Sequence, residues 1–131
     1  ARHFAAVSRD PRRLARQIKA IDKLNARLKG IRILKACEVD ILADGTLDLA
    51  DDCLAQLDIV VASIHSHFTQ DEAQMTDRVL RALECRWVDV LGHPTGRRLL
   101  QRDAIRLRMD DVVAAATTAG VALEVNSQLE R

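Results

Sequence analysis

Stretches with helical spacing of apolar residues alternate with short, nearly continuous apolar runs along the 131-residue chain. Apolar residues that recur at steps of three and four predict helices at residues 11–29, 71–85 and 107–120, with a short helix at 51–56. Runs of branched apolar residues predict strands at residues 31–39, 58–64, 88–94 and 121–126. This alternation is typical of a parallel sheet covered by helices. The predicted fold class is therefore α/β, as a β/α barrel or part of one.

Signals at the ends of the first helix support this reading. Asp10 is a good N-cap, and Pro11 suits the first helical position because the N–H that proline lacks would have no helical partner there. Gly30 is expected to end the helix. An acidic run is expected to cap the short helix that follows: Asp48, Asp51 and Asp52.

The composition fits one domain with a core of aliphatic residues. Apolar residues make up 48% of the chain, whereas aromatic residues make up only 2%, so leucine, isoleucine, valine and alanine must fill the core. The formal net charge of +1 creates no global field that would favour nucleic acid or membranes. Local basic clusters are interpreted as solvated helix faces: Arg12, Arg13 and Arg16; Arg97, Arg98 and Arg102; Arg106 and Arg108.

The cysteines and the hydropathy favour a cytoplasmic protein. Cys37, Cys53 and Cys85 are widely spaced, no C-x-x-C is present, and an odd number argues against a disulfide framework. Reduced, buried thiols are the simplest interpretation. No apolar stretch is long enough to span a bilayer, and the first residues do not resemble a signal peptide. We therefore expect no membrane partner.

Polar side chains that can bind metals stand where the predicted strands end. They are Glu38 followed by Asp40, His65 in the sequence VVASIHSHF, His93 after Gly92, and Glu124 with Asn126. The carboxyl ends of parallel strands share one edge of a sheet, and chemistry gathers there in α/β folds. Glu38, His65 and His93 are therefore expected to meet. Two imidazoles and a carboxylate form a typical ligand set for zinc, manganese or iron.

Each of these residues has another interpretation when it is taken alone. A single histidine at a strand end is commonly a hydrogen-bonded loop residue, and a single glutamate is commonly a cap or a salt-bridge partner. The equivalent places of the three residues in successive units favour the metal site. His67 alternates with His65 and is a weaker candidate, while His3 has no pattern around it and is expected to be exposed.

Five segments resemble a known family: CEVDILADGTLDL, DIVVASIHSHF, MTDRVLRAL, VDVLGHPTGRRLL and ALEVN. They are similar to the polymerase-and-histidinol-phosphatase (PHP) domain, in the version found at the C-terminus of bacterial family X DNA polymerases. The resemblance runs from about residue 10 to the end of the sequence. The combination of EVDILxDGxLD, MTxR and GHPTGR is the part that points to the polymerase X branch.

The resemblance implies a distorted seven-stranded β/α barrel and a site with up to three divalent ions, zinc or manganese. It implies hydrolysis of phosphoesters, which in this branch means removal of nucleotides from DNA 3′ ends beside a polymerase domain in the same chain. By position in the motifs, Glu38 matches the bridging carboxylate, and His65 and His93 match single-metal ligands. Arg97 in GHPTGR is implied to lie near the scissile phosphate or to brace its loop, and His67 is assigned to substrate binding.

Several segments of the family pattern are absent from these residues. They are the opening H-x-H strand, the D-H-S segment and the closing D-x-H strand, so residues 1–131 are expected to be an internal part of a PHP domain. Alone, this part is expected to bind metal weakly, to hydrolyse little, and to self-associate through open sheet edges. Two other functions stay open: a non-catalytic PHP scaffold that supports a polymerase, and a small-molecule phosphatase of the histidinol-phosphate type.

Overall fold

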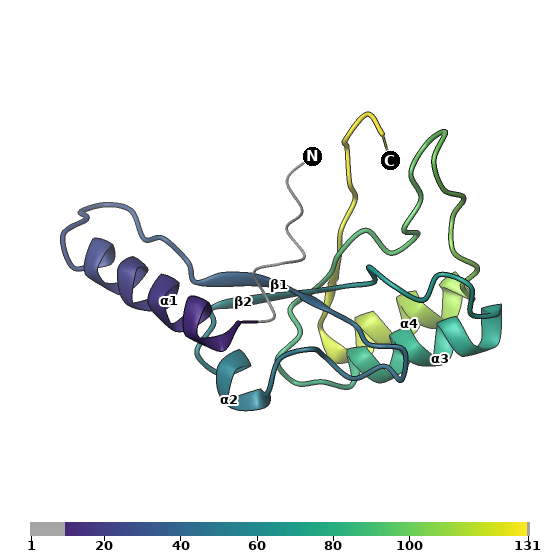
Figure 1. Ribbon diagram of the computed structural model, residues 1–131, viewed down its shortest axis with the longest axis horizontal. Helices are drawn as coiled ribbons and strands as arrows, with labels where there is room; N and C mark the ends of the chain where they lie inside the picture. The colour runs from purple at the N-terminus through teal and green to yellow at the C-terminus, as the bar shows by residue number, and fades with distance from the viewer. Residues whose placement is uncertain (1–9, 131) are drawn as a thin grey trace.

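The computed structural model describes residues 10–130, in which helices and strands alternate. The elements are α1 (Pro11–Asn25), β1 (Ala36–Asp40), α2 (Asp51–Leu54), β2 (Ile59–Ser63), α3 (Glu72–Leu83), β3 (Val90–Leu91), α4 (Met109–Ala119) and β4 (Ala122–Leu123). Figure 1 shows this path from the purple α1 to the yellow C-terminal segment. The prediction for His3 falls outside the described residues. None of the helices within residues 10–130 is long and apolar enough to cross a membrane.

The strands form one parallel sheet in the order β1-β2-β3-β4, so neighbours in sequence are neighbours in space. All three strand pairs are parallel. The predicted α/β class with a parallel sheet is therefore confirmed. Residues 10–130 supply four strands of an open sheet, and closure into a seven-stranded barrel stays a prediction.

One face of the sheet is packed and the other is only half-buried. Val39, Ala62 and Leu91 lie in register across three strands and are at most 2% exposed. Glu38 and Val61, which form the adjacent row, are half-buried. In the view of Figure 1, α2, α3 and α4 lie below β1 and β2. Because strand residues alternate between faces, the helices cover one row and leave the row of Glu38 accessible.

The first helix is shorter than predicted. It ends at Asn25 rather than at residue 29 because the Asn25 side chain pairs with both backbone groups of Ile33. Asn25 Nδ2 donates to Ile33 O at 2.8 Å, and Ile33 N donates to Asn25 Oδ1 at 2.8 Å. The apolar face is buried only at its start, at Leu14 and Ile18. Further along the same face, Ile21 is half-buried, and Leu24 and Leu28 are exposed.

The first strand also differs from its prediction. β1 begins at Ala36, and the apolar residues of 31–34 are exposed. Its entry is held by Asp58, whose carboxylate accepts a hydrogen bond from Lys35 N at 2.8 Å. The strand continues to Asp40, so Glu38 lies within β1 and not at its end. β3 and β4 are shorter than predicted, with two residues each.

Two of the later helices have well-defined ends. Asp71 caps α3 in a capping box with Gln74, where Gln74 N donates to Asp71 Oδ1 at 2.8 Å. α4 ends at Gly120, which adopts the left-handed conformation with φ of 73°. The prediction that Asp48 caps the short helix is wrong, since Asp48 Oδ1 accepts instead from Asp40 N at 2.9 Å. The three cysteines are free, and only Cys37 among them is buried.

Candidate metal centre

Three side chains from three consecutive strands converge at the carboxyl edge of the sheet. Glu38 lies within β1, His65 follows β2 and His93 follows β3. Glu38 Oε1 is 3.3 Å from His65 Nε2 and 3.1 Å from His93 Nε2. The two imidazole rings meet edge to face, with centroids 5.2 Å apart. The structure therefore brings the trio named from the sequence to one point.

Asp40 orients the imidazole of His65 from the end of β1. Its buried carboxylate oxygen Oδ1 accepts a hydrogen bond from His65 N at 3.0 Å and lies 3.4 Å from His65 Nδ1. With a proton on Nδ1 facing this carboxylate, Nε2 points toward Glu38; it donates a hydrogen bond there in the metal-free chain and would offer its lone pair to a cation that displaces that proton. A carboxylate behind the distal nitrogen is the usual support of a metal-binding histidine.

The backbone of His93 is held from β4. His93 N donates to Glu124 Oε2 at 2.5 Å, and Asn126 Nδ2 donates to Glu124 Oε1 at 3.0 Å. His93 has a positive φ of 29°, in a region that L residues rarely adopt. Its side chain is only 9% exposed. Backbone strain of this kind persists where the surroundings impose it, and it concentrates at functional sites.

The glycine before His93 is required by packing. A Cβ at Gly92 would lie 2.3 Å from Ser63 Oγ and 2.9 Å from Val61 Cγ1, both of which belong to β2. Distances this short do not occur between real side chains, so only glycine lets the end of β3 approach β2 this closely. The G-H segment thus sets the depth at which the His93 ring enters the site.

The charges of the trio are strongly coupled. Hydrogen bonds from His65 first, and then from His93, hold the pKa of Glu38 far below its ordinary value of 4.5. In return, the hydrogen bond to Glu38 raises the pKa of His65 above 6.5, although burial opposes this. The carboxylate is therefore ionised and attracts positive charge. A cation at this point would compete with the proton of His65, as metals do with the protons of their ligands.

The donor set fits a divalent transition metal. One ligand atom from each of Glu38, His65 and His93 lies within 4.8 Å of the other two. Two imidazole nitrogens and one carboxylate oxygen suit zinc or manganese. In addition, His93 Nδ1 is buried without a hydrogen-bond partner among residues 10–130. Such nitrogens are rare, which fits a ring whose remaining contact comes from a group other than these residues.

The two residues assigned to substrate binding stand outside this cluster. His67 is exposed with φ of 54°, because the chain has already turned away from the strand. Arg97 is exposed, and its side chain makes no ion pair with the described residues. Arg102 braces the loop: its guanidinium donates to Gly96 O at 2.9 and 2.7 Å and stacks 3.7 Å above the ring of Phe68. The loop that contains Arg97 is therefore anchored beside the segment that follows His65.

Three supporting residues received no role from the sequence. Asp40 and Glu124 were visible as polar residues at strand ends, but nothing local indicates that one holds His65 and the other His93. The third is Arg78, in the MTDR segment, which is buried on α3 and bonds to Ile41 O and Ser66 O. An arginine on an otherwise apolar helix face is the one signal that could have marked it.

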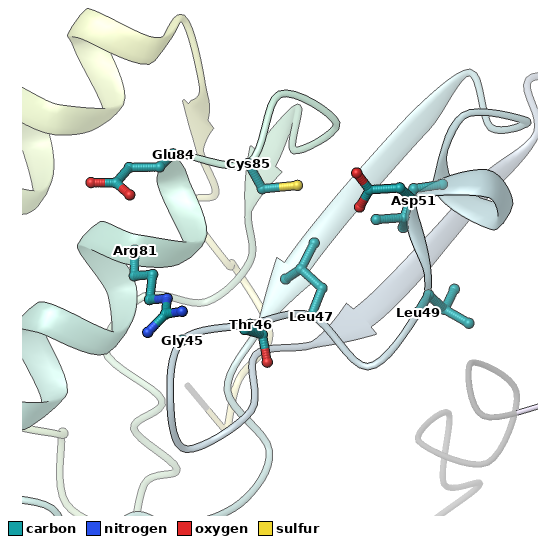
Figure 2. Close-up of a pocket in the computed structure, with 9 residues that line it drawn as sticks. Gly45, Thr46, Leu47, Leu49, Asp51, Arg81, Glu84 and Cys85 are labelled. Atoms are coloured by element: carbon teal, nitrogen blue, oxygen red, sulfur yellow. The ribbon is translucent and has the colours of Figure 1, made fainter.

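A separate depression of about 320 Å³ lies between the loop after β1 and the end of α3. Figure 2 shows Arg81 directed toward Gly45, with Glu84 and Cys85 at the end of the same helix and Asp51 on the opposite side. Its lining contains none of the trio Glu38, His65 and His93. The candidate metal centre and this depression are therefore distinct features.

No protein-family model matches the chain. Similarity to curated proteins is clear, however. The chain is 46% identical over 119 residues to DNA polymerase/3'-5' exonuclease PolX of Bacillus subtilis (strain 168), covering 91% of this chain and 21% of that protein. It is 33% identical over 108 residues to a probable phosphatase of Thermoanaerobacter sp. (strain X514), covering 79% of this chain and 42% of the phosphatase. A probable phosphatase of Shewanella sp. (strain ANA-3) is 35% identical over 101 residues, covering 75% and 38%.

The parallel sheet with a histidine and carboxylate cluster at its carboxyl edge, together with these relatives, places the chain in a class of α/β domains that includes proteins named as probable phosphatases. Within this class, the chain belongs to the PHP family, as a domain of the PolX type. The resemblance found in the motifs is thus confirmed. The chain spans about a fifth of the length of the PolX relative and about two fifths of the phosphatases.

Proposed function

We propose that this chain is a metal-dependent phosphoesterase module that trims DNA 3′ ends in a PolX-type protein. The main observation that supports this proposal is the convergence of Glu38, His65 and His93. The Nε2 atoms of both histidines lie within 3.3 Å of Glu38 Oε1. The similarity to a DNA polymerase/3'-5' exonuclease supports DNA as the substrate and a polymerase domain in the same protein as the partner.

Glu38, His65 and His93 would hold zinc or manganese in this proposal. The bound ions would supply a nucleophilic hydroxide near neutral pH and would stabilise charge on the leaving oxygen. Asp40 keeps the His65 ring oriented and holds a proton at Nδ1, so that Nε2 remains available. Glu124 fixes the backbone of His93, which keeps the second imidazole at the same depth. These residues preorganise the ligands before a cation arrives.

Substrate binding is assigned to the exposed residues beside the centre. Arg97 carries an unpaired guanidinium among the described residues, and a planar guanidinium suits bidentate contact with a phosphate. His67 lies two residues beyond His65, on the segment that Phe68 and Arg102 anchor. An anionic phosphodiester repels a hydroxide nucleophile, so positive charge close to the ligands offsets that repulsion.

The direct test is metal binding by the purified chain, measured by isothermal titration with Mn²⁺ and Zn²⁺. The double variant His65→Ala with His93→Ala should lose binding, whereas Glu84→Gln, a change to an exposed carboxylate at the end of α3, should not. Equal metal binding by the double variant and the wild type would refute the proposal. Because residues 1–131 alone are expected to hydrolyse little, hydrolysis of a 5′-labelled single-stranded oligonucleotide is assayed in the PolX-type protein of the proposal, with loss in Glu38→Gln expected.

A second candidate is a phosphatase that acts on small phosphomonoesters, because several relatives are probable phosphatases. The two candidates differ in the substrate and share the metal centre. Comparing an oligonucleotide with p-nitrophenyl phosphate separates them. Arg97→Met should lower hydrolysis of the oligonucleotide more than that of the small ester if the DNA substrate is correct, and an equal effect on both would favour the phosphatase.

A further inference from the structure

The MTDR segment of α3 contains a buried charge that the metal centre leaves unexplained. Arg78 is only 2% exposed, although its neighbours Met75 and Val79 form the apolar face of the helix. Arginine is almost never this buried unless most of its donors are satisfied. Of the three guanidinium nitrogens of Arg78, only Nε has no hydrogen-bond partner among residues 10–130. Its contacts therefore indicate what the residue does.

Arg78 joins the two chain segments that leave the metal site. Its Nη1 donates to Ser66 O at 3.1 Å, and its Nη2 donates to Ile41 O. Ser66 directly follows His65, and Ile41 directly follows Asp40, the residue that orients His65. One planar guanidinium thus spans the exits of β1 and β2 immediately beyond the metal ligand and its support.

A third contact extends this bridge. Nη1 also donates to Gln70 Oε1 at 3.1 Å, and Gln70 Nε2 donates to Ala43 O at 3.0 Å. Gln70 lies on the segment after β2, while Ala43 lies on the segment after β1. The two exits are therefore joined twice, once by Arg78 itself and once through the amide that Arg78 holds.

The energetics argue against a role in stability alone. Burial lowers the pKa of Arg78, and the nearby carboxylates Asp40 and Asp44 oppose this. Replacing buried ionic groups by apolar ones of similar volume is commonly neutral or stabilising, so stability does not call for an arginine here. A fork with fixed donor directions, however, defines the spacing of two carbonyls in a way that an aliphatic side chain does not.

We propose that Arg78 is a positioning residue, which fixes His65 by clamping the chain after Asp40 to the chain after His65. This inference rests on the proposed metal site. The arginine of the MTDR segment thus acts at the edge of the proposed metal site. Met75 and Thr76 of the same segment are fully buried and belong to the core.

The test compares Arg78→Lys, Arg78→Met and a matched control, Arg81→Met, in the 131-residue chain. Arg81 lies one turn further along the same helix and is exposed. Lysine keeps the charge near Asp40 but cannot donate to both carbonyls from a fork. Two quantities are measured: affinity for Mn²⁺ by titration, and amide hydrogen exchange of His65, whose N–H is bonded to Asp40.

Arg78→Lys and Arg78→Met should weaken Mn²⁺ binding by about 10- to 100-fold, the range for residues that orient metal ligands, with circular dichroism unchanged. Exchange of the His65 amide should accelerate in both, and Arg81→Met should match the wild type in both measurements. Wild-type affinity and exchange in folded Arg78→Lys would overturn the inference, including the case in which Arg78→Met fails to fold. If the wild type binds no metal, the proposed function fails, and the exchange of the His65 amide alone decides whether the clamp exists.

Discussion

Replacing Gly92 by alanine tests whether packing between β2 and β3 sets the position of His93. The added Cβ would lie 2.3 Å from Ser63 Oγ and 2.9 Å from Val61 Cγ1. Ser63 is fully buried, so it cannot swing into solvent to make room. Overpacking of a close-packed interior typically lowers the free energy of unfolding by about 1–3 kcal/mol. Because the added Cβ collides with two side chains, we expect a loss of about 3 kcal/mol for Gly92→Ala. For a domain of this size the melting temperature should fall by roughly 10 °C.

The assay is a double-mutant cycle with Ser63→Ala, followed by urea denaturation and circular dichroism. Ser63 contributes less than His65 and His93 to lowering the pKa of Glu38, so the single Ser63→Ala change is expected to cost little. In the double variant the worst collision disappears, whereas that with Val61 remains. The cycle should therefore show a coupling of about 1–2 kcal/mol, with the double variant more stable than Gly92→Ala alone.

The same variants connect packing to the metal site. Because His93 directly follows Gly92, the displaced strand end should also weaken Mn²⁺ binding, and Ser63→Ala should restore part of it. A Gly92→Ala chain with wild-type stability would refute the packing argument. If the two substitutions have additive effects on the free energy of unfolding, and Ser63→Ala restores no stability to Gly92→Ala, the loss does not arise from the contact with Ser63.

The remaining predictions concern the support of the ligands, pH, a helix cap and association. Asp40→Asn should weaken Mn²⁺ binding about tenfold by titration, because His65 loses the carboxylate behind its ring, and an unchanged affinity would remove that role. In the metal-free chain, the Glu38–His65 pair should stabilise the fold fully between pH 4.5 and 6.5. Its contribution is lost as the pH falls toward the lowered pKa of Glu38, and as the pH rises through the raised pKa of His65. Urea denaturation in the presence of a chelator should show the free energy of unfolding decreasing on both sides of this range, and Glu38→Gln should remove much of this pH dependence. Asp71→Ala should cost about 1 kcal/mol in thermal unfolding through loss of the α3 cap, with Asp52→Ala as a control expected to cost less. Sedimentation should show concentration-dependent association through the open edges at β1 and β4, and a clean monomer at high concentration would contradict it.

Features that depend on neighbouring residues were predicted well. The helical spacing of α3 and the end of α4 at Gly120 depend on residues within a few positions of one another, so they can be predicted from the local sequence. Errors occur where a distant residue intervenes. α1 ends early because Asn25 pairs with Ile33, and β1 begins late at a point held by Asp58, which is 23 residues from Lys35.

The candidate metal ligands Glu38, His65 and His93 were predicted in part. Alternation of helices and apolar strands predicts a parallel sheet, and a parallel sheet places all carboxyl ends at one edge. This argument brought Glu38, His65 and His93 together, although Glu38 and His93 are 55 residues apart. The argument from parallel strands predicted that the three residues share one edge of the sheet. It did not predict the distances between them, because the predicted strand ends differ from the observed ones by one or more residues.

The sequence by itself therefore determined the α/β class, the parallel direction of the strands and the types of side chain that meet at their ends, because each depends on local periodicity and on a general rule of sheet topology. Only the tertiary structure decided which groups support those ligands. Asp40 reaches His65, Glu124 holds the backbone of His93, and Arg78 joins two segments separated by 25 residues. Such contacts depend on where each side chain lies after packing, and no pattern within one element records that position.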